Sequence, residues 1–336
     1  MDDAKMFRVI IFAFSLALYL LASWVQNAAW AQANRPTSVT PNSPDSRPDE
    51  SVLTLHTAVS EVHLIFTVTD KHGHYVKDLK ENDFKILDDH KPPEAILNFR
   101  SETNLPLQVG LLIDTSQSVR ERFEFEQREA IEFLHQTLRQ KHDQAFVMGF
   151  DATPKVTQDF TDDIDRLSVG VHRLQPGSLT AMNDAVHYAC LDKLMKRPQT
   201  GPIRRIIILL SDGNDNSSSI TRAKTIEMAQ QAEVSVYTIS TSLARSGGRG
   251  QKNLASIADA TGGRSFVPVQ LNGVTNAFAA IQEELRSQYA VSYKPAAFKL
   301  DGHYRTIEIQ AQKQKGLRIR SRKGYRSVRR DYTSTQ

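Results

Sequence analysis

One carboxylate and two hydroxyls follow an apolar run in "LLIDTSQSV", residues 111–119. Asp114, Ser116 and Ser118 stand at alternate positions in this stretch. An ordinary polar turn would use the same residue types, because Asp and Ser are common turn formers. The other interpretation is one rim of a site for a hard cation, which prefers oxygen ligands. The motif alone does not decide between the two, so other segments of the chain have to contribute.

Two further segments place oxygen ligands in comparable positions. Asp212 follows the apolar run of "RRIIILLSD", and Thr180 lies in a glycine-containing loop, "PGSLT", that opens a helical pattern. The three segments together offer two carboxylates and three hydroxyls, with no His or Cys. This set favours Mg²⁺, or else Ca²⁺ or Mn²⁺, over Zn²⁺ and Cu²⁺. Because neutral hydroxyls leave the ion electrophilic, a carboxylate from a partner protein could complete its shell.

The elements that must position these residues alternate between strand-like and helical patterns from residue 105 to residue 286. The strand candidates are 107–114, 144–150, 204–212, 234–240 and 264–269, and the helix candidates are 119–140, 184–195, 221–232, 251–261 and 274–287. Nearly all-apolar strands alternating with helices predict an α/β fold, a Rossmann-like, mostly parallel sheet with helices on both faces. Ligands of such sheets bind beyond the carboxyl ends of the strands, where the three segments fall.

Strand patterns flank this region on both sides. Apolar residues alternate in "EVHLIFTVTD", and short strand-like runs separated by "DG" and "KQKG" turns return after residue 287. We therefore predict β-rich segments before and after the α/β domain. The two flanks could pack against each other as one split β-domain, a hypothesis that the sequence does not test.

The amino-terminal segment predicts export. Lys5 and Arg8 precede an uncharged stretch over 9–25, and the small-x-small pattern of a cleavage site ends at Ala31. The protein would then be periplasmic, in the cell envelope or secreted. An uncleaved anchor is the alternative, because the apolar run approaches the roughly 17–25 residues of a membrane span. The predicted organisation is a signal peptide (1–31), a disordered linker (32–50), a β-rich module (51–104), the α/β domain (105–286), a β-rich extension (287–328) and a tail (329–336).

The distribution of charge limits which classes of partner are expected, and the cysteine content limits which bonds the chain can form. The net charge of +4 is small for 336 residues, so nucleic acid is not expected as a partner, and a membrane only if the amino-terminal segment stays uncleaved. Nine basic residues and no acid lie between Lys313 and Arg330, and the alternation around Leu317 and Ile319 indicates a strand with its arginines toward solvent. The alternative is a basic patch that binds anionic lipid or polysaccharide. Cys190 is the single cysteine and is expected to be a buried apolar residue.

Catalysis is not expected from these residues. A serine nucleophile needs a base held by a third group, and neither Ser116 nor Ser118 lies in a G-x-S-x-G motif. The chain contains no H-E-x-x-H or phosphate-binding G-K-[ST] motif. Other acids near the motifs have structural explanations. Asp151 and Asp215 are interpreted as loop formers, and Asp184 as support for the first turn of its helix.

The three motifs in order resemble the von Willebrand factor A domain. They are D-x-S-x-S after a strand, a distant Thr before a helix, and S-D-G after another strand. The resemblance implies a metal-ion-dependent adhesion site made of Asp114, Ser116, Ser118, Thr180 and Asp212. The flanks resemble a bacterial secreted group of von Willebrand factor A-related proteins, over residues 60–326 in all. One departure concerns "GSLT", because many relatives have two glycines directly before the Thr.

The resemblance and the ligand set together predict a function in binding. The leading expectation is divalent-cation-dependent binding of a protein that offers an acidic side chain, in adhesion or envelope assembly. The alternative is a structural interaction protein with a vestigial metal site, which would bind through its β-flanks or its basic tail.

Overall fold

The structure is a computed structural model that describes residues 61–101, 104–117, 122–197, 202–242, 248–270, 272–312 and 316–327. The predicted signal peptide, linker and tail lie outside these residues, as does Ser118. Across the described ranges, no helix is both long and apolar enough to cross a membrane.

A six-stranded sheet forms the centre of the α/β part, in the order β6-β5-β4-β7-β8-β9. Its strands are β4 (Leu107–Asp114), β5 (Gln144–Phe150), β6 (Pro154–Thr161), β7 (Arg204–Ser211), β8 (Val234–Ser240) and β9 (Ser265–Phe266). All neighbours pair in parallel except β6, which runs antiparallel to β5. The five predicted strands are confirmed, although β9 is shorter than expected.

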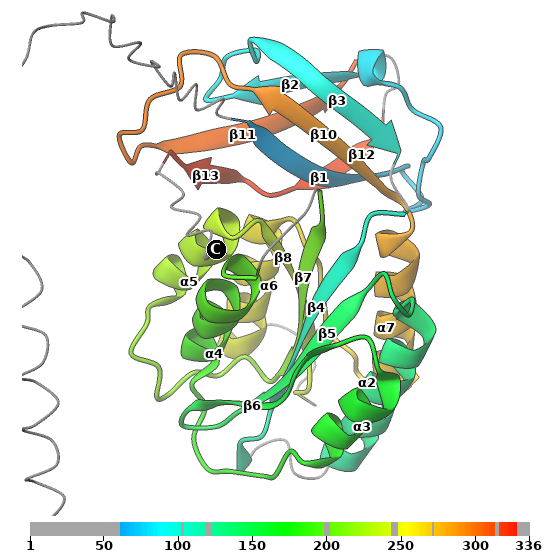
Figure 1. Cartoon of the computed structure of the whole chain (residues 1–336), viewed down its shortest axis with the longest axis vertical. Helices are drawn as coiled ribbons and strands as arrows, with labels where there is room; N and C mark the ends of the chain where they lie inside the picture. The colour runs from blue at the N-terminus through cyan, green and yellow to red at the C-terminus, as the bar shows by residue number, and fades with distance from the viewer. Residues whose placement is uncertain are drawn as a thin grey trace, which may run out of the picture. The chain divides into compact units, whose positions relative to one another are not determined.

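Helices cover both faces of this sheet (Figure 1). On one face lie α2 (Phe123–Thr137), α3 (Ile164–His172) and α7 (Asn272–Leu285). On the other lie α4 (Met182–Tyr188) with its π-helical continuation η3 (Ala189–Met195), α5 (Arg222–Gln231) and α6 (Arg249–Thr261). Each face has its own apolar core, since the strands point alternate side chains to opposite sides. The predicted fold class is thus confirmed.

The two β-rich flanks pair with each other into a β-sandwich. One sheet has the order β12-β1-β10-β3 and the other β13-β11-β2. The strands before the α/β part are β1 (Val62–Thr69), β2 (Phe84–Asp88) and β3 (Ala95–Ser101), with the 3₁₀ turn η1 (Glu81–Asp83) before β2. Those after it are β10 (Gln288–Lys294), β11 (Tyr304–Ala311), β12 (Arg318–Ser321) and β13 (Gly324–Arg326). Antiparallel pairing of β1 with β10 and of β2 with β11 confirms the hypothesis that the flanks pack together.

A buried acid on α7 joins the sandwich to the α/β part. Glu284 has no exposed surface and accepts hydrogen bonds from Arg320 on β12 at 2.7 and 2.9 Å. The hydroxyls of Tyr75 and Tyr237 also donate to it, each at 3.0 Å. The expectation that the arginines of this strand face solvent is therefore wrong for Arg320, because a buried carboxylate draws it inward.

Two other sequence expectations have clear outcomes. Arg322 is also buried, and it donates to the carbonyls of His63 at 2.8 Å and Gln230 at 3.3 Å, so the basic segment is partly structural. Cys190 is fully buried in the core of its face, as expected. Gly262 ends α6 with a φ of 83°, the left-handed conformation that favours glycine.

Candidate cation site

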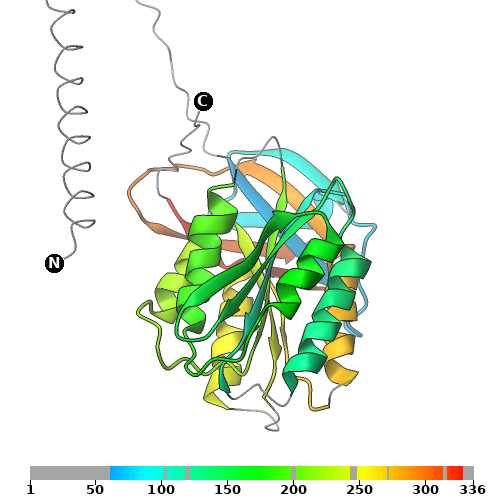
Figure 2. The same ribbon diagram turned by 60° about the horizontal axis from the view of Figure 1, so that its bottom comes forward.

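The carboxyl ends of β4 and β7 meet at one edge of the central sheet. Asp114 is the last residue of β4, and Ser211, the last residue of β7, directly precedes Asp212. The amino ends of the same strands lie beside the sandwich, where Arg204 on β7 bonds to Leu105 and Gln288. The candidate site is therefore at the end of the sheet away from the sandwich (Figures 1 and 2).

Asp114 is the buried centre of this edge. Its Oδ1 accepts from the backbone N–H of Ser116 at 2.9 Å, and its Oδ2 from the hydroxyl of Ser211 at 2.6 Å. Burial raises the pKa of Asp114 to about 6, although the hydrogen bonds from Ser211 and Ser116 act in the opposite direction. The charge of Asp212 raises this pKa further, so the two carboxylates lie within electrostatic range.

The loop that carries Thr180 is joined to the loop after Asp114. The backbone N–H of Gly177 donates to the carbonyl of Thr115 at 2.5 Å, and the N–H of Ala181 donates to the carbonyl of Asp151 at 2.6 Å. A Cβ on Gly177 would lie 2.1 Å from Oδ2 of Asp151, so only glycine allows this approach. Asp151 forms a turn, as predicted, because its Oδ1 accepts a hydrogen bond from the N–H of Thr153. Asp151 also packs on the Thr180 loop.

The same loop is also joined to the loop after Asp212. The N–H of Thr180 donates to Oδ1 of Asn216 at 2.9 Å. In return, the N–H groups of Asn216 and Ser217 donate to the carbonyl of Thr180, both at 3.1 Å. Thr180 is buried, whereas Asp212 is half-buried and accepts from the N–H and the side-chain amide of Asn214. Asp114, Ser116, Thr180 and Asp212 thus lie on three loops that hydrogen bonds connect directly; Ser118 lies outside the described residues.

Two nearby acids hold the loops rather than face an ion. Asp215 accepts from the N–H and the side-chain amide of Asn183 at 2.8 and 2.6 Å, and from Ser218. Asp184 accepts from the N–H groups of Ser219 and Ile220 at 3.0 and 2.8 Å. Asp215 is a loop former, as predicted, but Asp184 binds the loop after β7 and not only the first turn of its own helix.

One acid of this region was missed from the sequence. Glu126 on α2 is fully buried, and neither of its carboxylate oxygens has a hydrogen-bond partner in the described part of the chain. Burial raises the pKa of Glu126 to about 8, and the charge of Asp114 raises it too, while Arg122 lowers it. The sequence did contain a signal, because Glu126 falls on the same helical face as Phe123, Ala130 and Phe133.

The donor set fits a divalent cation. Buried carboxylates need a counter-charge, and without one Asp114 is repelled by Asp212 and by Glu126. Within the described ranges there is no cluster of three or more His, Cys, Asp or Glu that could hold a metal. The candidate site is of another kind, since it combines two carboxylates with hydroxyls, the oxygen donors that Mg²⁺ prefers.

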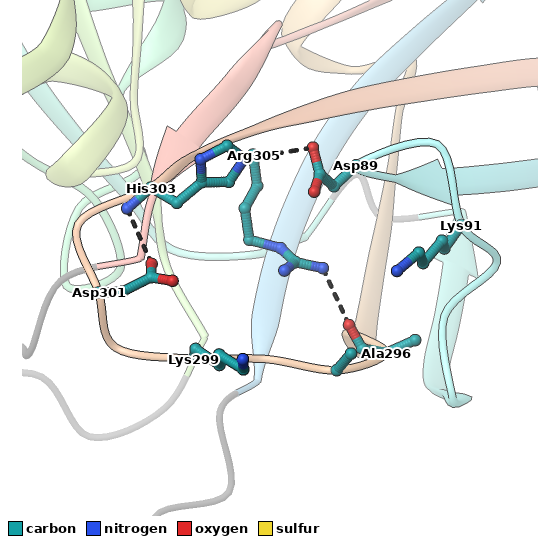
Figure 3. Close-up of a pocket in the computed structure, with 8 residues that line it drawn as sticks. Asp89, Lys91, Ala296, Lys299, Asp301, His303 and Arg305 are labelled. Carbon is teal, nitrogen blue, oxygen red and sulfur yellow. Dashed lines mark hydrogen bonds and ion pairs between the residues drawn. The ribbon is translucent and has the colours of Figure 1, made fainter.

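A hollow of about 220 Å³ on the sandwich is a second place where charged groups gather (Figure 3). The ring of His303 lies 3.6 Å from Asp89, and the backbone N–H of His303 donates to Oδ1 of Asp301. Arg305 donates to the carbonyl of Ala296 at 3.0 Å and forms a buried ion pair with Asp88. Lys91 and Lys299 also line the hollow, which therefore gathers basic groups and not a set of oxygen donors for a cation.

The comparisons with known proteins agree with this fold. Residues 109–214 match the family model of the von Willebrand factor type A domain, over less than half of the chain. Residues 109–214 are therefore similar to the von Willebrand factor type A domain family. The curated proteins contain no significant match to it.

Solved structures are similar to this chain at low sequence identity and with TM-scores below 0.5. A von Willebrand factor type A protein from Catenulispora acidiphila is 14% identical, with a TM-score of 0.46 over 81% of this chain and 75% of that one. An aerotolerance-related membrane protein from Bacteroides fragilis is 17% identical, with a TM-score of 0.43 over 53% of this chain and 98% of that one.

Mussel byssus proximal thread matrix protein 1 has been solved with a zinc-occupied MIDAS motif. It is 12% identical, with a TM-score of 0.48, over 59% of this chain and 49% of that one. The present chain thus spans about half of the thread protein's length.

Proposed function

We propose that the protein binds a divalent cation at the carboxyl ends of β4 and β7 and uses it to hold an acidic side chain of a partner protein. Asp114, Ser116, Ser118, Thr180 and Asp212 are the proposed donors, with Mg²⁺ as the expected ion and Ca²⁺ or Mn²⁺ as alternatives. The observation that carries the proposal is the direct hydrogen bonding of the three loops around a buried Asp114. The ion would supply the positive charge that these buried carboxylates need.

The surroundings of the site support binding of a protein rather than a small molecule. Leu179, next to Thr180, exposes 46% of its surface, and Asn214 and Asn216 are exposed on the adjoining loop. When a carboxylate of the partner protein binds the ion, neighbouring apolar and hydrogen-bonding groups of the partner would contact Leu179, Asn214 and Asn216. Adhesion or envelope assembly is the setting we propose, in keeping with the predicted export signal at residues 1–31.

Titration of MgCl₂ by calorimetry tests the cation site. Wild type should give saturable heat, and Asp114→Ala should give none while its far-ultraviolet circular dichroism stays unchanged. Equal heats from both proteins would refute the site. A pull-down from envelope extract, with and without EDTA, then tests the role of the ion, since partner binding that survives EDTA favours an interaction protein with a vestigial site.

A further inference from the structure

The hollow on the sandwich lies between two connecting segments and one strand. The turn after β2 contributes Asp89 and Lys91, and the connection from β10 to β11 contributes Lys299 and His303. Arg305, on β11, completes the lining. The volume of about 220 Å³ is below the roughly 300–1,000 Å³ of pockets for drug-sized ligands. The hollow therefore suits a small molecule or one end of a larger one.

The backbone is strained around this hollow. Among the described residues five that are not glycine have a positive φ, and three of them are Asp89 at 51°, His90 at 64° and Ala297 at 50°. Asp89 and His90 are the central residues of a tight turn, closed by backbone bonds of 2.8 and 3.1 Å between Asp88 and Lys91. Such residues are uncommon and tend to gather at ligand-binding sites. Their concentration here favours a role for the hollow in binding.

Arg305 presents a fixed positive group to the hollow. It is buried, and it donates from Nε to Asp88 at 2.5 Å and from Nη2 to the carbonyl of Ala296 at 3.0 Å. Asp88 also accepts from the hydroxyls of Tyr293 and Tyr325, both at 2.8 Å, which hold this pair in place. A guanidinium has five N–H donors, and these bonds use two of them. Donors thus remain for a ligand, in a position that does not have to be ordered on binding.

Lys91 and Lys299 bring two further positive charges to the same hollow. Both side chains are exposed, and neither forms an ion pair within the described ranges of the chain. In Figure 3 the guanidinium of Arg305 is drawn between the two lysines. Three cationic groups around one small hollow repel one another, and an anionic group bound among them would relieve that repulsion.

The two acids of the hollow differ in how they are bonded. Asp301 accepts from the backbone N–H of His303 and from the hydroxyl of Ser327, both at 2.9 Å, so it holds its own loop. The carboxylate of Asp89 has only the ring of His303, at 3.6 Å, as a neighbour of opposite charge in the described part of the chain. Asp89 can therefore accept a hydrogen bond from a hydroxyl group of a ligand.

We propose that the hollow binds a small hydroxylated anion, of the class of sugar acids and sugar phosphates. The carboxylate or phosphate contacts Lys91, Lys299 and Arg305, and a neighbouring hydroxyl donates to Asp89. Bonds between cationic donors and such anionic oxygens are about twice as strong as neutral ones. The site lies on the sandwich, at the other end of the central sheet from the candidate cation site, and it does not depend on a bound cation.

Calorimetric titration of the full chain in EDTA tests the proposal, because EDTA removes any cation through which an anion could bind elsewhere. Glucuronate and glucose 6-phosphate are the probes, since they carry a carboxylate and a phosphate on similar sugars. The tighter of the two identifies the anionic group that the hollow prefers. Glucose, which has the hydroxyls without the charge, should give no saturable heat.

Substitution of the two lysines locates the binding. Lys91→Gln and Lys299→Gln should each weaken binding of the tighter probe about tenfold, because each removes one charged donor from an exposed side chain. Lys85→Gln is the matched control, since Lys85 is exposed on β2 outside the hollow, and its affinity should equal that of wild type. Far-ultraviolet circular dichroism of all three variants should match that of wild type.

Three results would overturn the proposal. They are no saturable heat from either anionic probe, equal affinity in the Lys85, Lys91 and Lys299 variants, and binding of glucose as tight as that of glucuronate. None of these results bears on magnesium binding at the ends of β4 and β7, which is measured separately.

Discussion

The hydroxyl of Ser211 at the end of β7 donates to Oδ2 of Asp114 at the end of β4, at 2.6 Å. The same hydroxyl accepts from the N–H of Gly213 at 3.0 Å, so Ser211 holds the start of the loop that carries Asp212. One side chain thereby holds the carboxylate of Asp114 and the start of the loop that carries Asp212. These two bonds give a physical reason for a serine directly before Asp212 in the S-D-G motif.

Ser211→Ala should weaken both the fold and the site. The lost bond is to a buried carboxylate, and bonds to charged groups contribute about 1.5–3 kcal/mol to stability. Urea denaturation in EDTA should show that the free energy of unfolding falls by about this amount. Magnesium affinity should fall as well, because Asp114 loses the donor that orients it. Unchanged stability and unchanged affinity would show that the bond has no such role.

Gly177→Ala tests the joint between the Thr180 loop and Asp151. The added Cβ would lie 2.1 Å from Oδ2 of Asp151, so the loop or that side chain has to move. We expect weaker magnesium binding in calorimetry with retained secondary structure. Ser178→Ala is the control, because Ser178 is exposed in the same loop. A Gly177 variant that binds as tightly as the Ser178 variant would show that the loop position does not matter.

The sequence predicted the fold well where burial determines the pattern. β4, β5, β7 and β8 are buried along nearly their whole length. Four of the five predicted helices bury an apolar stripe, whereas α5 buries only Thr225, Ala229 and Gln230. The region between Asp151 and Leu174 was less clear. There β6 is a half-exposed edge strand without a strong apolar period. The helix α3 is only nine residues long and was not predicted, although Ile164, Leu167 and Val171 recur at helical spacing.

The candidate site was predictable in part. Asp114, Ser116, Thr180 and Asp212 come at strand ends or helix starts, which a linear pattern can indicate. The bonds of Asn216 to Thr180 and of Gly177 to Thr115 depend on how loops meet in space, which a pattern does not encode. Glu126 was missed because a charged residue on a helix is ordinarily assigned to solvent.

Glu284→Gln should strongly destabilise the protein. The carboxylate of Glu284 is fully buried and receives both bonds from Arg320, together with the two tyrosine hydroxyls. Removing one member of a buried pair leaves the other uncompensated, at a cost of about 3–5 kcal/mol. Equilibrium denaturation measures this loss.

Arg318→Met is the control for this pair, because Arg318 is exposed on the same strand as Arg320. It should change stability by less than about 0.5 kcal/mol. Arg320→Met should cost far more, and the Glu284→Gln, Arg320→Met double variant should cost less than the two single changes together. Additive losses would show that the two residues do not act as a pair.

Asp143 should contribute a pH-dependent part of the stability. Burial alone would raise its pKa, but bonds from the side chain and N–H of Arg139 and from the N–H of Leu107 outweigh burial and lower it. A lowered folded pKa stabilises the protein above the unfolded value of about 4, and this contribution is lost as pH falls through the folded pKa. Asp143→Asn should therefore be less stable than wild type at pH 7, with a smaller difference at pH 3. Urea denaturation at both values measures this, and a difference independent of pH would contradict the assignment.

Asp212 and Asp215 lie three residues apart in one loop, and their contacts predict opposite phenotypes. Asp215 accepts four hydrogen bonds from Asn183 and Ser218, so Asp215→Ala should lower the unfolding free energy in EDTA by about 1–3 kcal/mol. Asp212 is half-buried and bonds only locally to Asn214 among the described contacts, so Asp212→Ala should cost little stability and remove most of the magnesium heat. Denaturation in EDTA and calorimetry with MgCl₂, performed on both variants, separate the two roles. The reverse pattern, with stability lost in the Asp212 variant and binding lost in the Asp215 variant, would place the ion against Asp215 instead.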